Sequence, residues 1–539
     1  MKKIFYEAEA RDKVLSGAKQ LYDAVKVTFG PKGQNVIIEK SYGAPTITHD
    51  GVTVAEAVDL GSTDENLGEQ IGAKLIKTAA QKLNKTAGDG TTTVTVLTYN
   101  ILNEANKLIA AGVNPMELRK GIETAGAEIV AKIDQKAEKI AGSNQKIAEV
   151  ATISAGDAEI GTLIAEVISK IGKDGVVTVE AGQGLEMEKE IVEGFSYDKG
   201  FSSPFFVTDV NRQEAIFDKP SILITDQKIS STNDILPILE NCAAAGKKDL
   251  VIIAEEVEGE ALSLLVLNKL KGVFNTLVLK APSFGDRRKD ILADIAILTD
   301  ATVVSADQGL KISEVGLEVL GSAKKIIATK DETTIIKGAG SQSEIANRIE
   351  LIKNQAQNAP SDYDREQFEK RAAALSGKVA VIKVGGATET EIEEKKFRVD
   401  DAVAATKAAL SEGIVAGGGV TLVNLANELK TDNSGAKIVQ NALKSPLIHI
   451  LNNAGLNSQA LLAEIEKSKP GFGINVMTPE QGIVDLKKAG VIDPARVTRE
   501  AVQNAVSIAA TAITMGALIV DVPEKEEANP AAGMGGGMY

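Results

Sequence analysis

The chain lacks tryptophan and has few of the residues that build disulfides and metal centres. Of its 539 residues, one is cysteine, two are histidine and 4% are aromatic. With Cys242 alone, neither an intrachain disulfide nor a cysteine metal cluster can form, and two histidines are too few for a histidine-rich metal site. The absence of disulfides fits a reducing compartment. Because aromatic rings are scarce, the cores must consist mainly of Ala, Val, Ile and Leu.

Positive charge is in the minority, and no long hydrophobic run is present. The chain has 60 Lys and Arg against 74 Asp and Glu, a net charge of −14, so it lacks the basic face that nucleic-acid binding needs. The N-terminus MKKIFYEAEARDK has no apolar core and does not predict secretion. The longest uncharged run, between Glu500 and Asp521, is interrupted by amides and hydroxyls, so it predicts a buried small-residue helix rather than a membrane span. We expect neither nucleic acid nor membrane partners.

Two helical regions flank a different middle region. The length predicts roughly three or four domains, at about 150 residues each. About the first 135 residues and the last part of the chain show helical patterns rich in small residues. Between them the strand-like runs SILIT, DLVIIAEE and TLVLKAP alternate with helical DILPILENCAAA and EALSLLVLNKL, which predicts an α/β domain with a parallel sheet. The expected fold is therefore mostly α with an inserted α/β domain, and the two chain ends form one discontinuous helical domain.

The stretch TAGDGTTTVTVL, residues 86–97, places an aspartate between two glycines and three threonines before a helix. The apolar residues Val94, Leu97 and Ile101 recur at helical spacing after Thr93, so the threonines lie at a helix start. Free N–H groups at such a start favour an anion, and Asp89 would tolerate a phosphate there if Mg²⁺ lay between them. An ordinary N-cap made by Thr or Asp explains the stretch equally well. No Walker A motif is present.

Several apolar side chains recur on single helix faces in the middle region, close to the aromatic stretch FSSPFF at 201–206. Taken as residues alone, they are best explained as packed core, because apolar helix faces are usually buried. These residues are Leu236 and Leu239, then Leu262 and Val266, with Leu267 beside them.

Many motifs, in one order along the chain, resemble the GroEL-type (group I) chaperonins. They are VTFGPKGQNVIIEK, APTITHDGVTVA, AGDGTTTVTVL, ATISAGD, IIAEEVEGEAL, APSFGDRRK, SDYDREQFEKR, EKKFRVDDAVAAT, GIVAGGGV, IDPARVTR and the GGM tail. The resemblance implies a three-domain subunit. Its segments would be equatorial 1–136 and 411–527, intermediate 137–193 and 378–410, apical 194–377, and a flexible GGM tail 528–539.

The resemblance implies an ATP-driven folding machine. Its members assemble as heptameric rings, usually two stacked back to back, bind non-native proteins, and are closed by a GroES-type co-chaperonin. ATP hydrolysis times the cycle, with Mg²⁺ as the metal. A bacterial-type cytosol is the expected location, and the matrix of an organelle is the alternative.

The resemblance also assigns a nucleotide site. Asp89 corresponds to the Mg²⁺ ligand, and the loop that it begins wraps the phosphates. A second phosphate contact corresponds to the turn at 28–31, while Gly418, Asp493 and Asn475 correspond to contacts with the nucleoside, the ribose and the base. The phosphate-binding residues are Thr28, Phe29, Gly30, Pro31, Asp89, Gly90, Thr91, Thr92 and Thr93. Val476 and Met477 stand where the family often has two alanines.

Two further aspartates, Asp50 and Asp401, correspond to the pair that orders and activates the attacking water. The first belongs to the equatorial part and the second to the intermediate part, so domain closure would assemble the site. Asp400 is expected to be a solvated charge. His49 is a departure, since most relatives carry lysine at this position, whose contacts to phosphate or K⁺ partly use backbone. Lys378 is another, at a hinge where glycine is common.

For the apical residues, the resemblance reverses the conclusion drawn from residues alone. It implies an exposed groove that binds both clients and the lid, because exposed apolar patches mark partner sites. The implied groove residues are Phe201, Ser203, Phe205, Phe206, Leu236, Leu239, Leu262, Val266 and Leu267.

Two other classes of function fit parts of the sequence. A nucleotide-dependent phosphotransferase could use the same phosphate loops, and it predicts a monomer or dimer. A ring scaffold without turnover would lack Asp50 or Asp401, and both are present.

Overall fold

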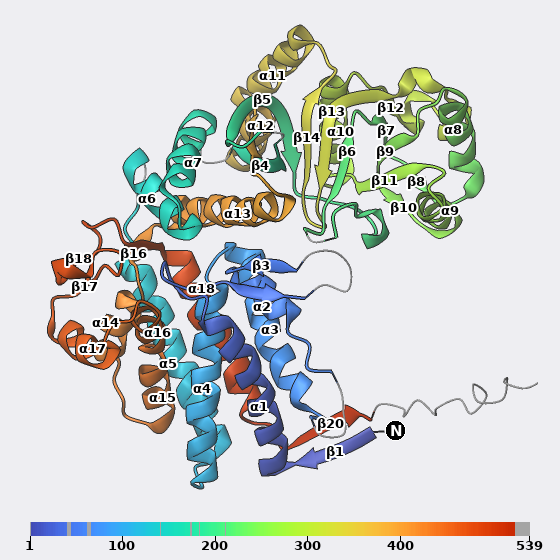
Figure 1. Ribbon diagram of the computed structural model, residues 1–539. Coiled ribbons are helices and arrows are strands. Elements are labelled where there is room, and N and C mark those ends of the chain that lie inside the picture. Colours follow the sequence, from blue (N-terminus) through green and yellow to red (C-terminus); the bar gives the residue numbers. More distant parts are fainter. Residues whose placement is uncertain are drawn as a thin grey trace, which may run out of the picture. The chain divides into compact units, whose positions relative to one another are not determined.

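The computed structural model describes residues 2–39, 45–61, 66–140, 142–172, 175–182, 184–210, 212–359 and 361–522, and it divides into two compact units (Figure 1). Unit 1 comprises the described residues of 1–169, 181–187 and 384–539, and unit 2 those of 170–180 and 188–383. Both ends of the chain therefore belong to one unit. The finer division into equatorial, intermediate and apical segments stays a prediction, and the GGM tail lies outside the described residues.

Unit 1 is mainly helical. Its helices are α1 (Glu7–Lys26), α2 (Gly51–Ala57), α3 (Glu69–Ala87), α4 (Thr91–Ala110), α5 (Pro115–Lys136), α6 (Asn144–Ala155), α7 (Ala158–Ile171), α13 (Glu389–Glu412), α14 (Val420–Glu428), α15 (Ser434–Ala442), α16 (Ser445–Asn453), α17 (Ser458–Lys467) and α18 (Ala495–Ala512). Its strands pair as antiparallel ribbons: β1 (Lys2–Tyr6) with β20 (Ala517–Asp521), β2 (Val36–Ile38) with β3 (Thr46–Thr48), β16 (Ile414–Ala416) with β19 (Ile492–Pro494), and β17 (Phe472–Ile474) with β18 (Ile483–Asp485).

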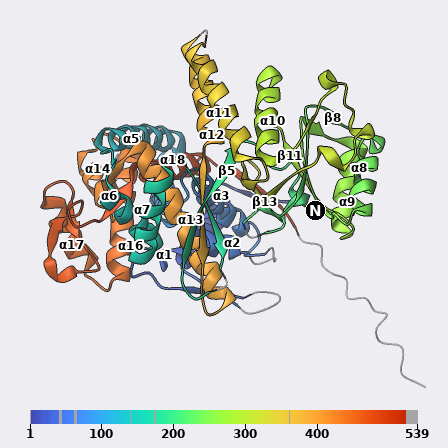
Figure 2. The same cartoon turned by 90° about the horizontal axis from the view of Figure 1, so that it is seen from above.

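The core of unit 1 is built from small aliphatic side chains, as the scarcity of aromatics predicts. Helix α4 packs beside α3 and α18, and α18 packs beside α5 (Figures 1 and 2). Close crossing of α1 and α3 depends on two glycines. A Cβ added to Gly17 would lie 1.7 Å from the Glu69 carbonyl oxygen, and one added to Gly72 would lie 1.8 Å from the Val14 carbonyl oxygen. No side chain other than hydrogen fits at either crossing point.

We predict that Gly17→Ala destabilises the protein, although alanine favours a helix by about 1 kcal/mol over glycine. The added methyl group meets backbone, which cannot rotate away, so overpacking should cost about 1–3 kcal/mol and prevail. Denaturant unfolding measures the change. Gly516→Ala is the matched control, because no atom lies within 4 Å of a Cβ there. A Gly17→Ala protein as stable as the wild type would contradict the close crossing.

Unit 2 contains one mixed sheet of ten strands in the order β11-β9-β7-β13-β14-β5-β15-β4, with β12 paired to β7 and β6 to β13. The strands are β4 (Val176–Ala181), β5 (Glu188–Tyr197), β6 (Ala215–Asp218), β7 (Ser221–Thr225), β9 (Asp249–Ala254), β11 (Asn275–Lys280), β12 (Val303–Val304), β13 (Gly321–Ala328), β14 (Thr333–Gly338) and β15 (Lys378–Val384), with a small pair of β8 (Lys228–Ile229) and β10 (Glu256–Val257). The helices are η1 (Pro204–Phe206), α8 (Thr232–Ala244), α9 (Gly259–Leu270), α10 (Gly285–Thr299), η2 (Ala306–Gln308), η3 (Ile312–Glu314), η4 (Leu317–Val319), α11 (Gln342–Gln357) and α12 (Asp362–Leu375).

The prediction of a parallel sheet is correct for only half of unit 2. Strands β7, β9, β11 and β12 are parallel, and helices α8, α9 and α10 connect them. Strands β13, β14, β5 and β15 pair antiparallel. The connections between the strands explain the antiparallel part. Parallel neighbours need a crossover connection, whereas a short turn joins β13 to β14. Lys378, expected at a hinge, begins β15 and pairs with Glu193 of β5. No helix of the described residues is long and apolar enough to cross a membrane.

Candidate functional site

A Gly-Asp-Gly turn joins α3 to α4 and explains the first motif. Gly88 and Gly90 have φ of +70° and +85°, a left-handed conformation that glycine adopts without strain. Helix α4 begins at Thr91 with Gly90 as N-cap, and no side chain caps it. The alternative of an ordinary Thr or Asp N-cap is therefore wrong. Free N–H groups of the first turn face outward from the helix start, as an anion site requires.

The start of α2 lies directly against the start of α4. A Cβ added to Gly51 would lie 2.3 Å from Thr92 Oγ1 and 3.0 Å from Thr91 Oγ1. Asp50 is the N-cap of α2, and its carboxylate accepts hydrogen bonds from the N–H groups of Val52 (3.2 Å) and Thr53 (2.8 Å). Thr53 also donates its hydroxyl to this carboxylate at 2.6 Å. Asp50 is thus held rigidly beside the threonines.

Asp401 lies on α13, the helix that packs against the Gly-Asp-Gly turn. A Cβ added to Gly88 would lie 2.1 Å from the Cβ of Ala404, so α13 touches the turn that carries Asp89. Loss of hydration raises the pKa of Asp401 well above its ordinary value, and the negative charges of Asp50, Asp89 and Asp400 raise it further. The pKa of Asp89 is also raised, chiefly by loss of hydration and further by the charge of Asp50. Asp400 is partly buried and acts on Asp401, so it is not merely a solvated charge.

Asp493 forms the far side of this acidic group. Its strand β19 pairs with β16, which leads into the glycines at 417–419. A Cβ added to Gly417 would lie 2.8 Å from Asp493 Oδ1. Loss of hydration and the charge of Asp89 raise the pKa of Asp493 to about 7, while the Gly418 N–H opposes the rise. Asp50, Asp89, Asp401 and Asp493 therefore influence one another across one acidic site.

The turn at 28–31 follows the end of α1. Thr28 is buried, and its hydroxyl and its N–H both donate to the Val25 carbonyl, at 2.8 and 3.1 Å. Gly30 has φ +80°. The ring of Phe29 packs against the apolar clusters on both sides of the turn. These contacts fix the shape of the turn.

The predicted base contact, Asn475, directly follows β17. Its Oδ1 accepts a hydrogen bond from the Met477 N–H at 3.0 Å. Val476 is buried, whereas Met477 is exposed. The departure from two alanines thus places one larger side chain in the core and one on the surface.

The side chain of His49 turns toward α13. Its Nδ1 lies 3.5 Å from Glu394 Oε1, and a full ion pair forms there only when the imidazole is protonated. Glu394 also forms an ion pair with Arg398, whose Nη2 donates to Glu394 Oε2 at 2.9 Å. The imidazole therefore contacts the helix that carries Asp401, and the His49 carbonyl remains the candidate contact for a monovalent ion.

The residues of the acidic site fit a nucleotide phosphate with Mg²⁺. No group of three or more Asp, Glu, His or Cys within the described residues is arranged to hold a metal by itself. Mg²⁺ often binds one or two carboxylates and completes its shell with water and substrate phosphates, which suits this arrangement. Ser154 Oγ is buried and has no hydrogen-bond partner among the described residues, although it lies near enough to Asp89 to oppose the rise in that pKa. Carboxylates with raised pKa and an unpaired hydroxyl are what a bound cation would relieve.

The predicted groove residues in unit 2 fall into three classes of exposure. Phe205 (63% exposed), Leu267 (48%) and Leu236 (37%) lie on the surface, on η1, α9 and α8. Leu262, Val266 and Ser203 are partly buried. The expectation of an exposed groove is wrong for three side chains, which are core: Phe201, Phe206 and Leu239. They fill the space between η1, the helices and the sheet, as the analysis of the residues alone predicted.

The exposed side chains lie on neighbouring elements. Helix α9 contacts both α8 and η1, and Figure 1 shows α8 and α9 at one end of the sheet of unit 2. Leu270 and Val273, which the sequence analysis did not select, are also exposed at the end of α9 and just after it. We call Phe205, Leu236, Leu267, Leu270 and Val273 the apolar patch.

Unit 1 carries an acidic site beside an uncapped helix start, which favours an anion site, and unit 2 carries an exposed apolar patch, which favours a partner site. The model of the TCP-1/cpn60 chaperonin family matches residues 21–523. The chain belongs to this family, whose members are ATPases coupled to protein folding. Family membership favours the chaperonin over a metabolic phosphotransferase.

Two contributors to the site were missed by the sequence analysis. Gly51 was quoted only as part of a motif, and its role appears once α2 and α4 are seen to touch. Ser154 lies on α6 in the motif ATISAGD, and nothing local to that motif connects it to Asp89. Each of these two residues is recognised only through a contact between segments that lie far apart in the sequence.

We predict that Asp493→Asn stabilises the nucleotide-free protein in a pH-dependent way. The carboxyl has a pKa of about 7 when folded against 3.8 normally, so the wild type loses stability as pH rises from about 4 to 7. The asparagine variant does not lose this contribution. Its melting temperature minus that of the wild type should therefore grow over that range and level off above it. Asp432→Asn, on an exposed loop of unit 1, is the control and should show no such trend.

Proposed function

We propose that this chain is a subunit of a GroEL-type, group I chaperonin that binds Mg·ATP at the acidic site of unit 1. The observation that carries the proposal is the approach of Asp50, Asp89 and Asp401, from three distant segments, to the uncapped start of α4. The ordered motifs of the sequence support group I within the broader family. A nucleotide site without bulky side chains at the phosphate loop is consistent with backbone binding of phosphates.

In this proposal each residue has a separate role. The N–H groups of Thr91, Thr92 and Thr93 bind phosphate, the turn at 28–31 makes a second phosphate contact, and Asp89 holds Mg²⁺. Mg²⁺ neutralises phosphate charge when it is bound. Gly418, Asp493 and Asn475 contact the nucleoside, and the His49 carbonyl contacts K⁺ or phosphate.

Asp401 is the better candidate for the base, and Asp50 for orienting the attacking water. The Asp50 carboxylate already accepts three hydrogen bonds from the start of α2, which fix its position. Asp401 has a raised pKa, and a proton acceptor works best when its pKa lies near the operating pH. In this proposal Asp50 positions the attacking water and Asp401 accepts its proton.

We predict that Asp401→Asn slows ATP hydrolysis by about 10²–10⁴-fold while Mg·ATP affinity is kept or increased. The amide cannot take a proton, and its neutrality relieves repulsion at the site. Single-turnover phosphate release and calorimetry measure the two quantities. Asp400→Asn, one residue away, is the matched control and should retain most of the rate. Near-normal hydrolysis by Asp401→Asn would exclude it as the base.

The apolar patch of unit 2 is the proposed client and lid surface. Non-native chains expose apolar segments, and a patch on two helices and a turn can bind many of them without strict shape requirements. A GroES-type co-chaperonin would use the same patch. Phe201, Phe206 and Leu239 support the patch from beneath.

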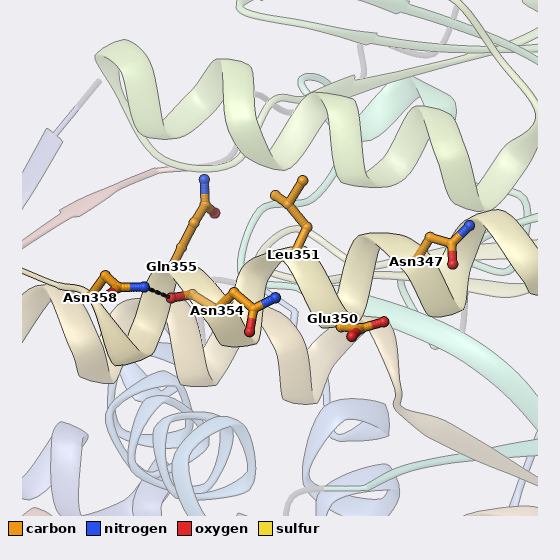
Figure 3. Close-up of a pocket in the computed structure, with 6 residues that line it drawn as sticks. All are labelled: Asn347, Glu350, Leu351, Asn354, Gln355 and Asn358. Carbon is orange, nitrogen blue, oxygen red and sulfur yellow. Dashed lines mark hydrogen bonds between the residues drawn. The ribbon is translucent and has the colours of Figure 1, made fainter.

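We predict that Leu267→Ser weakens capture of an unfolded client roughly tenfold or more, because a buried aliphatic contact contributes about 1.5–3 kcal/mol. ATP hydrolysis and melting temperature should stay unchanged, since Leu267 is 48% exposed. Two controls separate the causes. Leu265→Ser, in the core two residues away, should lower the melting temperature. Leu351→Ser alters an equally exposed leucine outside the patch, on the face of α11 drawn in Figure 3, and should change neither quantity. Normal capture by Leu267→Ser would exclude the patch.

Two ribbons of unit 1 support assembly into rings. Ile4 pairs with Ile519 across β1 and β20, and Ile37 pairs with Ile47 across β2 and β3. All four side chains are exposed on ribbons of two strands, whose free edges can pair with another chain. A stacked pair of heptamers closed by the co-chaperonin, in a bacterial-type cytosol or an organelle matrix, is the assembly we propose. Native mass with and without ATP and a GroES-type partner tests it.

A further inference from the structure

Helix α16 holds the turn at 28–31 in place through one amide group. The side-chain nitrogen Nδ2 of Asn453 donates to the carbonyl oxygens of Phe29 at 2.9 Å and of Lys26 at 3.0 Å. The Val27 carbonyl lies 3.5 Å from the same nitrogen. The carbonyls of Lys26 at the end of α1, of its C-cap Val27 and of Phe29 in the turn thus converge on one atom, from a residue more than 400 positions away in the sequence.

The geometry requires a nitrogen at this position. An amide oxygen would face three carbonyl oxygens and repel them, whereas an NH₂ group has two hydrogens to donate. The last carbonyls of a helix have no partner within the helix, so α1 needs donors from elsewhere at its end. The Lys26 carbonyl also accepts weakly from the Phe29 N–H (3.3 Å), and the Val27 carbonyl accepts from the Gln34 N–H (2.8 Å). Among the described residues, Asn453 alone donates to the Phe29 carbonyl.

Other contacts of α16 support the same turn and the end of α1. His449 lies one helical turn before Asn453, and its Nε2 is 2.7 Å from the hydroxyl oxygen of Tyr22 on α1. Ile450 lies under Gly30, where an added Cβ would be 3.2 Å from its side chain. Side chains of α16 therefore contact the end of α1 at two places, through His449 and Asn453.

Helix α16 is also part of the apolar cluster on the nucleoside side of the site. Ile450 and Leu451 share an apolar cluster with Ile474 and Val476, the residues on either side of Asn475. Helix α16 thus contacts the turn at 28–31 and shares an apolar core with the strand end that carries the candidate base contact.

We propose that Asn453 is a positioning residue for nucleotide binding, which fixes the backbone of the turn at 28–31 at the distance that a nucleotide phosphate requires. The inference rests on the proposed function, because it assigns the turn to phosphate. Asn453 does not touch the nucleotide itself. Its loss should therefore affect ligands that carry phosphates and leave the nucleoside part of the site unchanged.

The test compares ATP and adenosine binding to full-length Asn453→Asp and wild-type protein by calorimetry, with melting temperatures measured in parallel. The carboxylate repels the three carbonyls, so ATP should bind roughly tenfold more weakly. Adenosine affinity should change less than about twofold, and KM for ATP should rise more than kcat falls. Asn452→Asp places the same charge on the neighbouring exposed residue and controls for charge.

A second variant keeps the experiment decisive. If Asn453→Asp does not fold, Asn453→Ala removes the donor without a charge and should show the same preference for ATP, and Asn453→Gln, which keeps the amide, should recover part of the affinity. Equal losses for ATP and adenosine, or unchanged ATP affinity, would overturn the inference. A wild-type protein that binds no ATP would instead refute the proposed function.

Discussion

The packing of unit 1 has to offset the electrostatic repulsion between the carboxylates of one acidic site. Asp50, Asp89, Asp401 and Asp493 come from four segments, and burial together with mutual charge raises the pKa of the last three. A folded chain brings such groups together only if packing elsewhere offsets the cost. The aliphatic core of α1, α3, α4, α5 and α18 supplies that packing, and a nucleotide with its cation would remove much of the repulsion.

Close approach of backbone segments at a few glycines brings the residues of the acidic site together. Gly51 lets the start of α2 touch α4, and Gly88 lets α13 touch the turn that carries Asp89. Gly417 leaves room for the Asp493 carboxylate. At the first two contacts a methyl group would separate two segments that each bring an aspartate of the acidic site or a threonine of the α4 start. The glycines at these contacts therefore determine how close the carboxylates of the acidic site lie to one another.

Local pattern predicted the elements of the fold, and contacts between distant segments decided the rest. Helical spacing after Thr93 predicted the start of α4, and alternating runs predicted the strands β7, β9 and β11. The direction of β13 and β14 could not be predicted, because it depends on which strands become neighbours. Phe206 and Leu239 were assigned to the groove by resemblance, although their apolar spacing alone indicated core. Asn453 gave no local signal, since its acceptors lie at the other end of the chain.

The discontinuous unit has a consequence for how this protein is made. Unit 2 is nearly contiguous, and most of it leaves the ribosome as one stretch from 188 to 383. Unit 1 needs both ends, because β1 pairs with β20 from Lys2↔Asp521 to Tyr6↔Ala517. At about 5–20 residues per second, its N-terminal helices wait many seconds for α18 to be translated. During that interval the aliphatic faces of these helices are exposed to solvent. A chaperonin subunit therefore exposes apolar surface during its own synthesis, as non-native proteins do.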